Sequence, residues 1–104
     1  MPKAYMMVHL EATNQQAFVT CFATKVEAVV KEFGGKFIAR AGNSVHRHEN
    51  QFNGSVADVH GIVEFPDSKS AIAWYDSEQY KAILPARRDN TTNTYLAIIG
   101  GVED

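Results

Sequence analysis

The sequence predicts an α+β fold of the ferredoxin-like kind, with elements in the order β-α-β-β-α-β, and three observations lead to it. Residues 4–11 alternate between apolar and more polar side chains, which is typical of a strand with one buried face. Residues 13–33 carry phenylalanine and valine at helical spacing. Residues 57–65 form an apolar run that a proline ends and a capped helix follows. Elements in this order build a four-stranded antiparallel sheet with both helices on one face.

The composition is that of an ordinary globular domain. The chain has 104 residues, 45% of them hydrophobic, and a net charge of −2 with acids and bases mixed along it. We therefore expect a single domain over residues 1–104 and no nucleic-acid partner, because no basic face is implied. No apolar run reaches the ~20 residues of a membrane span. The lone Cys21 and the lack of an apolar signal-peptide core favour a reduced, cytoplasmic setting.

The first strand and the first helix are expected in the N-terminal third of the chain. Thr13 and Gln16 fit a capping box with Thr13 as the N-cap. Gly34-Gly35 ends the helix, because glycine accepts the left-handed conformation at a helix C-terminus. Between them a helix of roughly five turns carries a single apolar stripe. The stripe consists of Phe18, Phe22, Val26, Val29 and Phe33.

The second strand is expected over residues 36–41. Its alternation places Phe37 and Ala39 on one face and Ile38 and Arg40 on the other. The stretch that follows is rich in Asn, Ser, Gly and His without periodicity, so we expect a loop or a long hairpin connection there.

The third strand, residues 57–65, leads into the second helical region. Pro66 ends the strand, and Asp67 or Ser68 caps the helix that follows. The inward positions of this helix are expected to be Ala71, Ile72 and Tyr75, with Trp74 beside them.

A short helix and a final strand complete the chain. Ser77 is expected to cap another turn or two, and Pro85 to break or redirect that helix. Residues 94–99 form the last strand, which Gly100-Gly101 closes.

The strand phases predict which side chains lie on the sheet face that the helices leave open. That face is too apolar to meet water as one patch and too polar for a plain core, so a second copy of the chain is expected to cover it. Two facing sheets would enclose a cavity suited to a ligand. The open face is expected to carry Tyr5, Met7, His9, Ile38, Arg40, His60, Ile62, Glu64, Tyr95, Ala97 and Ile99.

Short motifs along most of the chain, roughly residues 3–101, resemble those of the DUF1330 family. The resemblance implies a ferredoxin-like protomer, a homodimer of the dimeric α+β barrel kind and no settled biochemical function. The polar positions that it brings over are Arg40, Glu64, Trp74, Tyr75, Ser77, Tyr80 and Arg87. The matching stretches are Tyr5, Phe33-Gly34-Gly35-Lys36-Phe37, Ala39-Arg40-Ala41-Gly42, Val63-Glu64-Phe65-Pro66, Ala73-Trp74-Tyr75-Asp76-Ser77, Tyr80 and Leu84-Pro85-Ala86-Arg87.

The chain departs from the family pattern in three places. Ala41-Gly42 follows Arg40, where the family often has two glycines, and Gln79 takes the usual position of a glutamate. The stretch 45–49 is also richer in histidine than the family pattern.

Glu64 and Arg40 each have two interpretations. A carboxylate in an apolar strand is either a general acid or base with a raised pKa, or half of an ion pair with Arg40 or an arginine at a helix end. Arg40 either holds the carboxylate or phosphate of a ligand, or it ties down a neighbouring acid or crosses the dimer interface.

The histidines also have two interpretations. His9 and His60 share a face of adjacent strands, which suits proton transfer or half of a metal site, and also suits hydrogen-bonded core residues. His46 and His48, followed by Glu49, have ligand-type spacing, but a solvated loop is the simpler interpretation. We expect no metal site.

Function is expected in a cavity between the sheet and the helices, where the protein handles a small organic acid or carbonyl compound. Cofactor-free acid–base chemistry is the mechanism considered. Glu64, His60 and Tyr80 are the candidate catalytic residues. Because no phosphate-binding glycine loop or nucleophile elbow is present, no cofactor is expected. A non-catalytic binding protein and a purely structural homodimer are the alternatives. The candidate binding residues are Arg40, Trp74, Ser77, Arg87 and His9.

Overall fold

The computed structural model describes residues 2–41, 45–49, 51 and 59–102. Its strands are β1 (Ala4–Ala12), β2 (Lys36–Ala41), β3 (Val59–Phe65) and β4 (Thr91–Gly100). Its helices are α1 (Gln15–Phe18), the π-helical segment η1 (Val19–Ala23), α2 (Thr24–Glu32), α3 (Ser68–Asp76) and α4 (Glu78–Asp89). No helix in the described ranges is long and apolar enough to cross a membrane.

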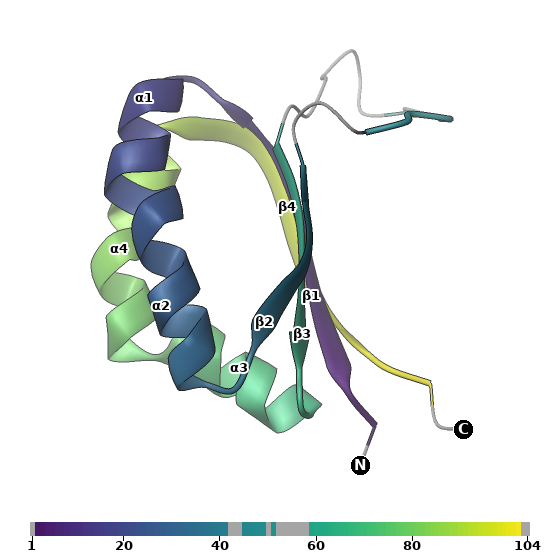
Figure 1. Cartoon of the computed structure of the whole chain (residues 1–104). Helices are drawn as coiled ribbons and strands as arrows, with labels where there is room; N and C mark the ends of the chain where they lie inside the picture. Colours follow the sequence, from purple (N-terminus) through teal and green to yellow (C-terminus); the bar gives the residue numbers. More distant parts are fainter. Residues whose placement is uncertain (1, 42–44, 50, 52–58, 103–104) are drawn as a thin grey trace.

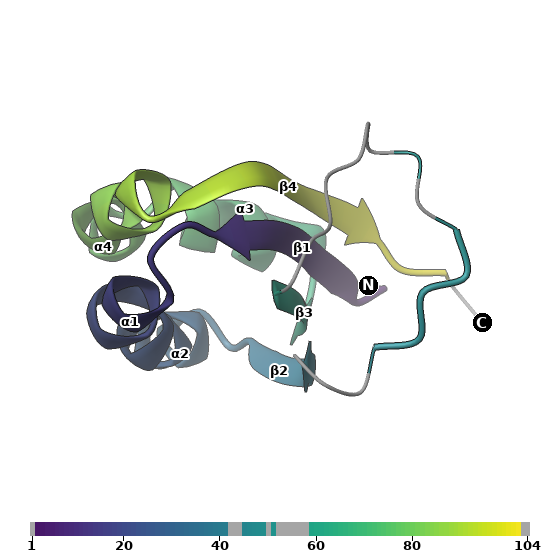
Figure 2. The same ribbon diagram turned by 90° about the horizontal axis from the view of Figure 1, so that it is seen from above.

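The strands form one antiparallel sheet in the order β2-β3-β1-β4, and the helices lie together on one face of it (Figures 1 and 2). The sheet is open at both edge strands and does not close on itself. The predicted ferredoxin-like α+β fold is therefore confirmed.

The register of β1 against β3 confirms the predicted strand phases. Tyr5 pairs with Glu64, and His9 pairs with His60. The alternate residues of β1, among them Met6 and Leu10, are buried under the helices. Ile38, Tyr95 and Ile99 on the other side are each about half exposed, at 49%, 52% and 49%.

A β-bulge in β2 makes the predicted face of Arg40 wrong. Phe37 pairs with Val63, and Ala39 pairs with the next residue of β3, so Ile38 is an extra residue in β2. Arg40 then pairs with Gly61 and returns to the helix side, where its guanidinium carbon lies 3.8 Å from the centre of the Phe37 ring. Strict alternation could not foresee this, because the bulge shifts every later side chain to the opposite face.

The first helical run covers residues 15–32, close to the predicted length, but its cap lies one residue later than expected. The Thr13 amide donates a hydrogen bond to the Asn90 carbonyl at 2.8 Å, which holds Thr13 in the preceding turn. Asn14 is the N-cap, and its side chain accepts from the Ala17 amide.

The predicted stop at Gly34-Gly35 is a Schellman motif. The Gly34 amide donates to the Lys31 carbonyl and the Gly35 amide to the Val30 carbonyl. Gly34 has φ +80°, in the left-handed region that favours glycine. Gly35 lies so close to the Phe65 ring that a Cβ would be 2.7 Å from it.

Asp67 caps α3, which is one of the two residues predicted for that cap, and Ser77 caps α4 as predicted. Pro85 does not end the helix as expected, because α4 continues to Asp89. Proline deprives the Lys81 carbonyl of its helical donor, but both residues are exposed, so this carbonyl is accessible to solvent. The expectation for Ile72 is also wrong, since its side chain is 52% exposed.

Candidate functional site

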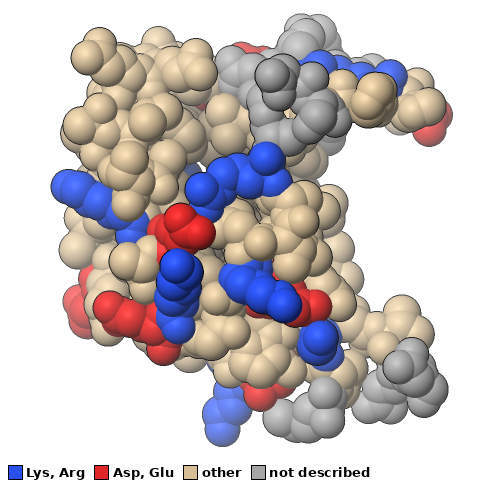
Figure 3. Space-filling view, in the orientation of Figure 1, with Lys and Arg blue, Asp and Glu red and all other residues tan. Residues whose placement is uncertain are grey.

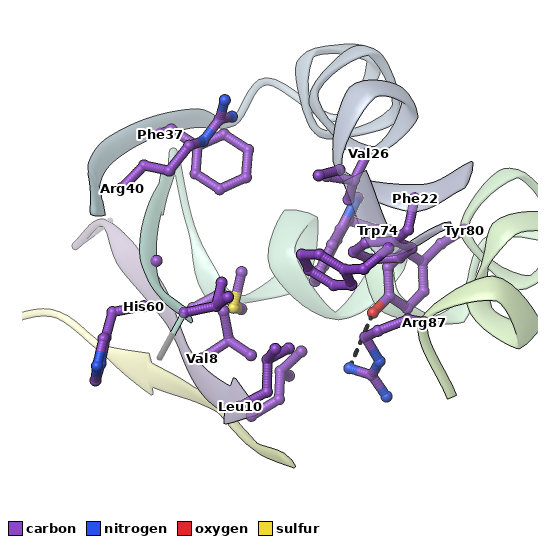
Figure 4. Close-up of a pocket in the computed structure, with 16 residues that line it drawn as sticks. Val8, Leu10, Phe22, Val26, Phe37, Arg40, His60, Trp74, Tyr80 and Arg87 are labelled. Carbon is purple, nitrogen blue, oxygen red and sulfur yellow. Dashed lines mark hydrogen bonds between the residues drawn. The ribbon is translucent and has the colours of Figure 1, made fainter. Parts of the chain in front are cut away.

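A cavity of about 80 Å³ lies between the helices and the sheet (Figure 4). Its wall is mostly apolar and includes Val8, Leu10, Phe22 and Val26 from β1 and the first helical run. An engineered apolar cavity of roughly 150 Å³ binds benzene, so this volume suits a short ligand or one end of a longer one. The polar side chains on the wall therefore decide what such a ligand must offer.

Arg87 brings a positive charge to this cavity from α4. Its residue is only 7% exposed, and its Nη1 donates a hydrogen bond to the Tyr80 hydroxyl oxygen at 3.4 Å. Its Nε is buried without a hydrogen-bond partner. Among the residues that the structure describes, no carboxylate forms a salt bridge with Arg87. A buried cation without a counter-charge is costly, so the site is short of an anion.

Tyr80 stands beside Arg87 on the same face of α4 and is almost fully buried. Burial raises the pKa of Tyr80 to about 12, although the nearby Arg87 charge works in the opposite direction. The phenol is therefore neutral at physiological pH. Because its oxygen accepts from Arg87, its own O–H is free to donate to a ligand.

Trp74 from α3 closes the same end of the cavity. Its ring centre lies 4.5 Å from that of Tyr80 and 5.6 Å from that of Phe65, and its side chain is fully buried. Its Nε1–H is buried and has no hydrogen-bond partner. Trp74 thus packs against neighbouring aromatic rings, and this packing leaves a polar donor unsatisfied.

Arg40 lies where β2 borders the cavity, and its side chain is about half exposed. It pairs with Glu27 of α2 at 3.7 Å and not with Glu64, the partner considered from the sequence. The charge of Arg40 is therefore already balanced, unlike that of Arg87. On the face seen in Figure 3, acidic and basic side chains are interspersed without a large area of one sign.

Glu64 lies on the open face of the sheet, away from the cavity. Its carboxylate is 3.4 Å from the Lys3 ammonium and 3.5 Å from that of Lys36. Partial desolvation pushes the pKa of Glu64 upward, but the two lysines outweigh it and the pKa is lowered. Glu64 therefore lacks the raised pKa that a general acid would need. It forms ion pairs, as the second interpretation expected, but its partners are Lys3 and Lys36 and not an arginine.

His9 and His60 are cross-strand neighbours on the open face, with ring centres 6.1 Å apart. His9 also stacks on Tyr95 at 5.2 Å. Figure 4 shows the His60 ring well away from the aromatic end of the cavity. In the described part of the chain no three ligand-type residues gather around a possible metal position.

The Ser77 side chain hydrogen-bonds to backbone groups at a helix end and does not line the cavity. Its hydroxyl donates to the Trp74 carbonyl at 2.7 Å and accepts from the Tyr80 amide at 3.1 Å. It thereby fixes the junction between α3 and α4 that sets Trp74 against Tyr80. His46 and His48 lie in an exposed segment without regular structure.

The structure thus brings some of the sequence candidates together and separates others. Trp74, Tyr80, Arg87, Arg40 and His60 border one cavity, while His9 and Glu64 lie on the open face of the sheet and do not line it. Sequence reasoning missed Phe22 and Val26 as cavity walls and missed the contact of Tyr80 with Arg87. The signal was present, because Tyr80, Leu84 and Arg87 recur at helical spacing. The expected break at Pro85 concealed it.

Comparison with known proteins places the fold. Residues 3–102 match the model of DUF1330, a domain of unknown function. Among curated proteins, none matches the chain.

Three solved structures resemble this chain at low sequence identity. The protein of unknown function RPA0582 from Rhodopseudomonas palustris has a TM-score of 0.77 at 12% identity, covering 99% of this chain and 85% of its own. A conserved protein from Methanosarcina mazei has a TM-score of 0.64 at 17% identity, with 98% and 95% covered. SnoaB from Streptomyces nogalater, a cofactor-independent oxygenase, has a TM-score of 0.62 at 11% identity, with 100% and 97% covered. At these identities the likeness concerns the fold alone.

Proposed function

This chain belongs to the DUF1330 family, and we propose that it binds a small, mostly apolar organic acid in the cavity between its helices and its sheet. The observation that carries the proposal is Arg87, a buried cation that borders an apolar cavity and has no carboxylate partner among the described residues. A ligand carboxylate supplies the missing charge and accepts from the unpartnered Nε–H. The apolar wall accommodates the rest of the molecule.

The neutral Tyr80 phenol supports the same ligand. Its O–H donates to a carboxylate oxygen while Arg87 donates to the phenol oxygen and to the carboxylate. The pKa of about 12 makes Tyr80 a poor base near neutral pH. The geometry therefore favours recognition of an anion over proton abstraction.

Acid–base catalysis finds less support in this cavity. Glu64 lies on the other face of the sheet, and His60 borders the cavity far from its aromatic end. A neutral phenol and a guanidinium also stabilise developing negative charge on a substrate oxygen, so electrostatic catalysis is compatible with the same residues.

Calorimetric titration tests the proposal with butanoate and 1-butanol, which share a chain length and differ in charge. We expect butanoate to bind and 1-butanol to bind at least about tenfold more weakly, because only the acid meets Arg87. Arg87→Met should abolish butanoate binding. Arg88→Met is the matched control, because Arg88 is the exposed neighbour on the same helix. Equal binding of both compounds, or unchanged binding by Arg87→Met, would refute the proposal.

We also propose that the chain forms a homodimer through the open face of the sheet. The face exposes Ile38, Tyr95 and Ile99 and adds the half-buried Met7 and Ile62. Exposed apolar side chains on one sheet face are typical of an interface. In sedimentation at micromolar concentration we expect a dimer that Ile99→Glu converts to monomer. Val19→Glu, which places the same charge at an exposed apolar residue of the helical layer, should leave the dimer intact. A monomeric wild type would contradict the proposal.

A further inference from the structure

We infer that Gly61 of β3 determines how long an acid the cavity accepts, because the side chain missing at this position leaves the space in which the end of the ligand chain lies. The inference deepens the proposed binding of a small acid and rests on it. It starts from a glycine that neither the backbone conformation nor the packing requires.

Gly61 is buried in the middle of a central strand. β3 lies between β2 and β1, and Gly61 pairs with Arg40 on one side and with Val8 on the other. Val63 and Phe65, the next two residues on the same face of the strand, are completely buried under the helices. A glycine inside a strand lowers stability relative to alanine, and it often marks a place where a ligand or another backbone approaches closely.

No backbone feature of the described residues explains this glycine. Its φ lies outside the left-handed region, unlike that of Gly34. A Cβ at Gly61 would lie 3.5 Å from a Val8 methyl carbon and 3.6 Å from a Phe37 ring carbon, which are ordinary van der Waals distances. The nearest backbone atom outside the adjacent residues, the Ala39 oxygen, would be 3.9 Å away. An alanine therefore fits at this position, and close approach of another strand does not account for the glycine.

The space that Gly61 leaves belongs to the cavity. Gly61, Val8 and Phe37 all line it, so the two side chains that a Cβ would touch are cavity walls. In Figure 4 Phe37 lies on the opposite side of the cavity from Tyr80 and Arg87. A ligand whose carboxylate meets Arg87 therefore extends its chain toward Gly61.

The size of the cavity makes a single carbon atom significant. Its volume is about 80 Å³, roughly half that of an apolar cavity that holds benzene, so the ligand chain has only a few carbons. A methyl group on residue 61 would then remove the room for about one methylene of the ligand. Each methylene that the apolar wall buries should raise the affinity about fourfold.

Calorimetric titration with the straight-chain acids from acetate to hexanoate is the first test. We expect the affinity of the wild type to rise with each added carbon and to stop rising at a definite chain length. Gly61→Ala should reach that limit about one carbon earlier and bind the shorter acids as the wild type does. Gly100→Ala is the matched control, because its Cβ would meet only the Ser68 hydroxyl at 3.7 Å and the residue does not line the cavity.

Val8→Ala makes the opposite change at the same end of the cavity. Its loss of two methyl groups enlarges the space beside Gly61, so the limit should move about one carbon later. Val30→Ala is the control for this variant, because Val30 is fully buried on α2 and does not line the cavity. It should lower stability without moving the limit.

Thermal unfolding of the ligand-free proteins adds a measurement that needs no acid. We expect Gly61→Ala to be at least as stable as the wild type, because alanine fits and fills empty space. A less stable Gly61→Ala would show that the fold itself needs the glycine, and the inference would then be wrong. If acids bind and Arg87→Met abolishes their binding, but Gly61→Ala keeps the wild-type limit, the inference is wrong and the proposed function stands. If no acid binds, both are wrong.

Discussion

Arg87 and Tyr80 lie seven residues apart on α4 and meet inside the protein, where Arg87 Nη1 donates to the Tyr80 hydroxyl oxygen at 3.4 Å. The contact joins a permanent cation to a phenol whose pKa is raised to about 12 by burial. It satisfies one donor of the guanidinium and supplies no negative charge. The ligand-free protein therefore carries an electrostatic cost that a bound anion would remove.

Replacing Arg87 with methionine should stabilise the ligand-free protein. The thioether fills a similar volume without a buried charge, so we expect the free energy of unfolding to rise by about 1 kcal/mol. Urea unfolding at neutral pH measures the change. A loss of more than about 2 kcal/mol would mean that Arg87 supports the fold in a way that its contacts do not reveal.

Tyr80→Phe should change how stability depends on alkaline pH. The folded protein holds the Tyr80 proton more tightly than the unfolded chain, since the pKa rises from 10.0 to about 12. The stability that this group contributes is complete below pH 10 and is lost as the pH rises toward 12. The stability of the wild type relative to Tyr80→Phe should fall through this window by up to about 1.4 kcal/mol per pH unit. Parallel unfolding curves from pH 9 to 12 would contradict the assignment.

Pro85→Ala should stabilise the protein by about 1–3 kcal/mol, because the new amide can donate to the Lys81 carbonyl and the proline ring no longer crowds that turn. Lys81→Ala, on the same exposed surface, is the control and should change stability by less than about 0.5 kcal/mol. Thermal unfolding of the three proteins measures the difference. A destabilised Pro85→Ala would show that the proline has a role in α4 that its exposed position conceals.

Gly35→Ala should destabilise the protein by about 1–3 kcal/mol. A Cβ at this position would lie 2.7 Å from the Phe65 ring and 2.9 Å from a Val30 methyl group, both in the core. Gly100→Ala is the matched control, since its Cβ would meet only the Ser68 hydroxyl at 3.7 Å. Equal stabilities of the two variants, measured by urea unfolding, would mean that the core side chains move to accept the added methyl group at Gly35.

The sequence was sufficient to predict the sheet and most of the helices. Side-chain alternation in β1 and β3 reflects burial on one face, and burial decides the register. The double glycine after α2 marks a helix end because its first residue needs positive φ. These signals are local, and each depends on the chemistry of a few neighbouring residues.

Features that depend on distant contacts could not be predicted. The position of the first cap depends on a hydrogen bond between Thr13 and Asn90, far apart in the sequence. The bulge at Ile38 depends on how β2 aligns with β3. The site has the same character, because Trp74, Tyr80 and Arg87 were all candidates but their meeting depends on α4 continuing through Pro85.

The extra residue in β2 has a consequence for the comparison of homologous sequences. A homologue that lacks one residue between Phe37 and Arg40 can keep its arginine beside α2, because removing the bulged residue preserves the later side-chain directions. A homologue of the same length with a straight strand turns the arginine to the opposite side. An alignment column occupied by arginine therefore does not reveal on which face of the sheet the arginine lies, whereas a one-residue gap beside it does.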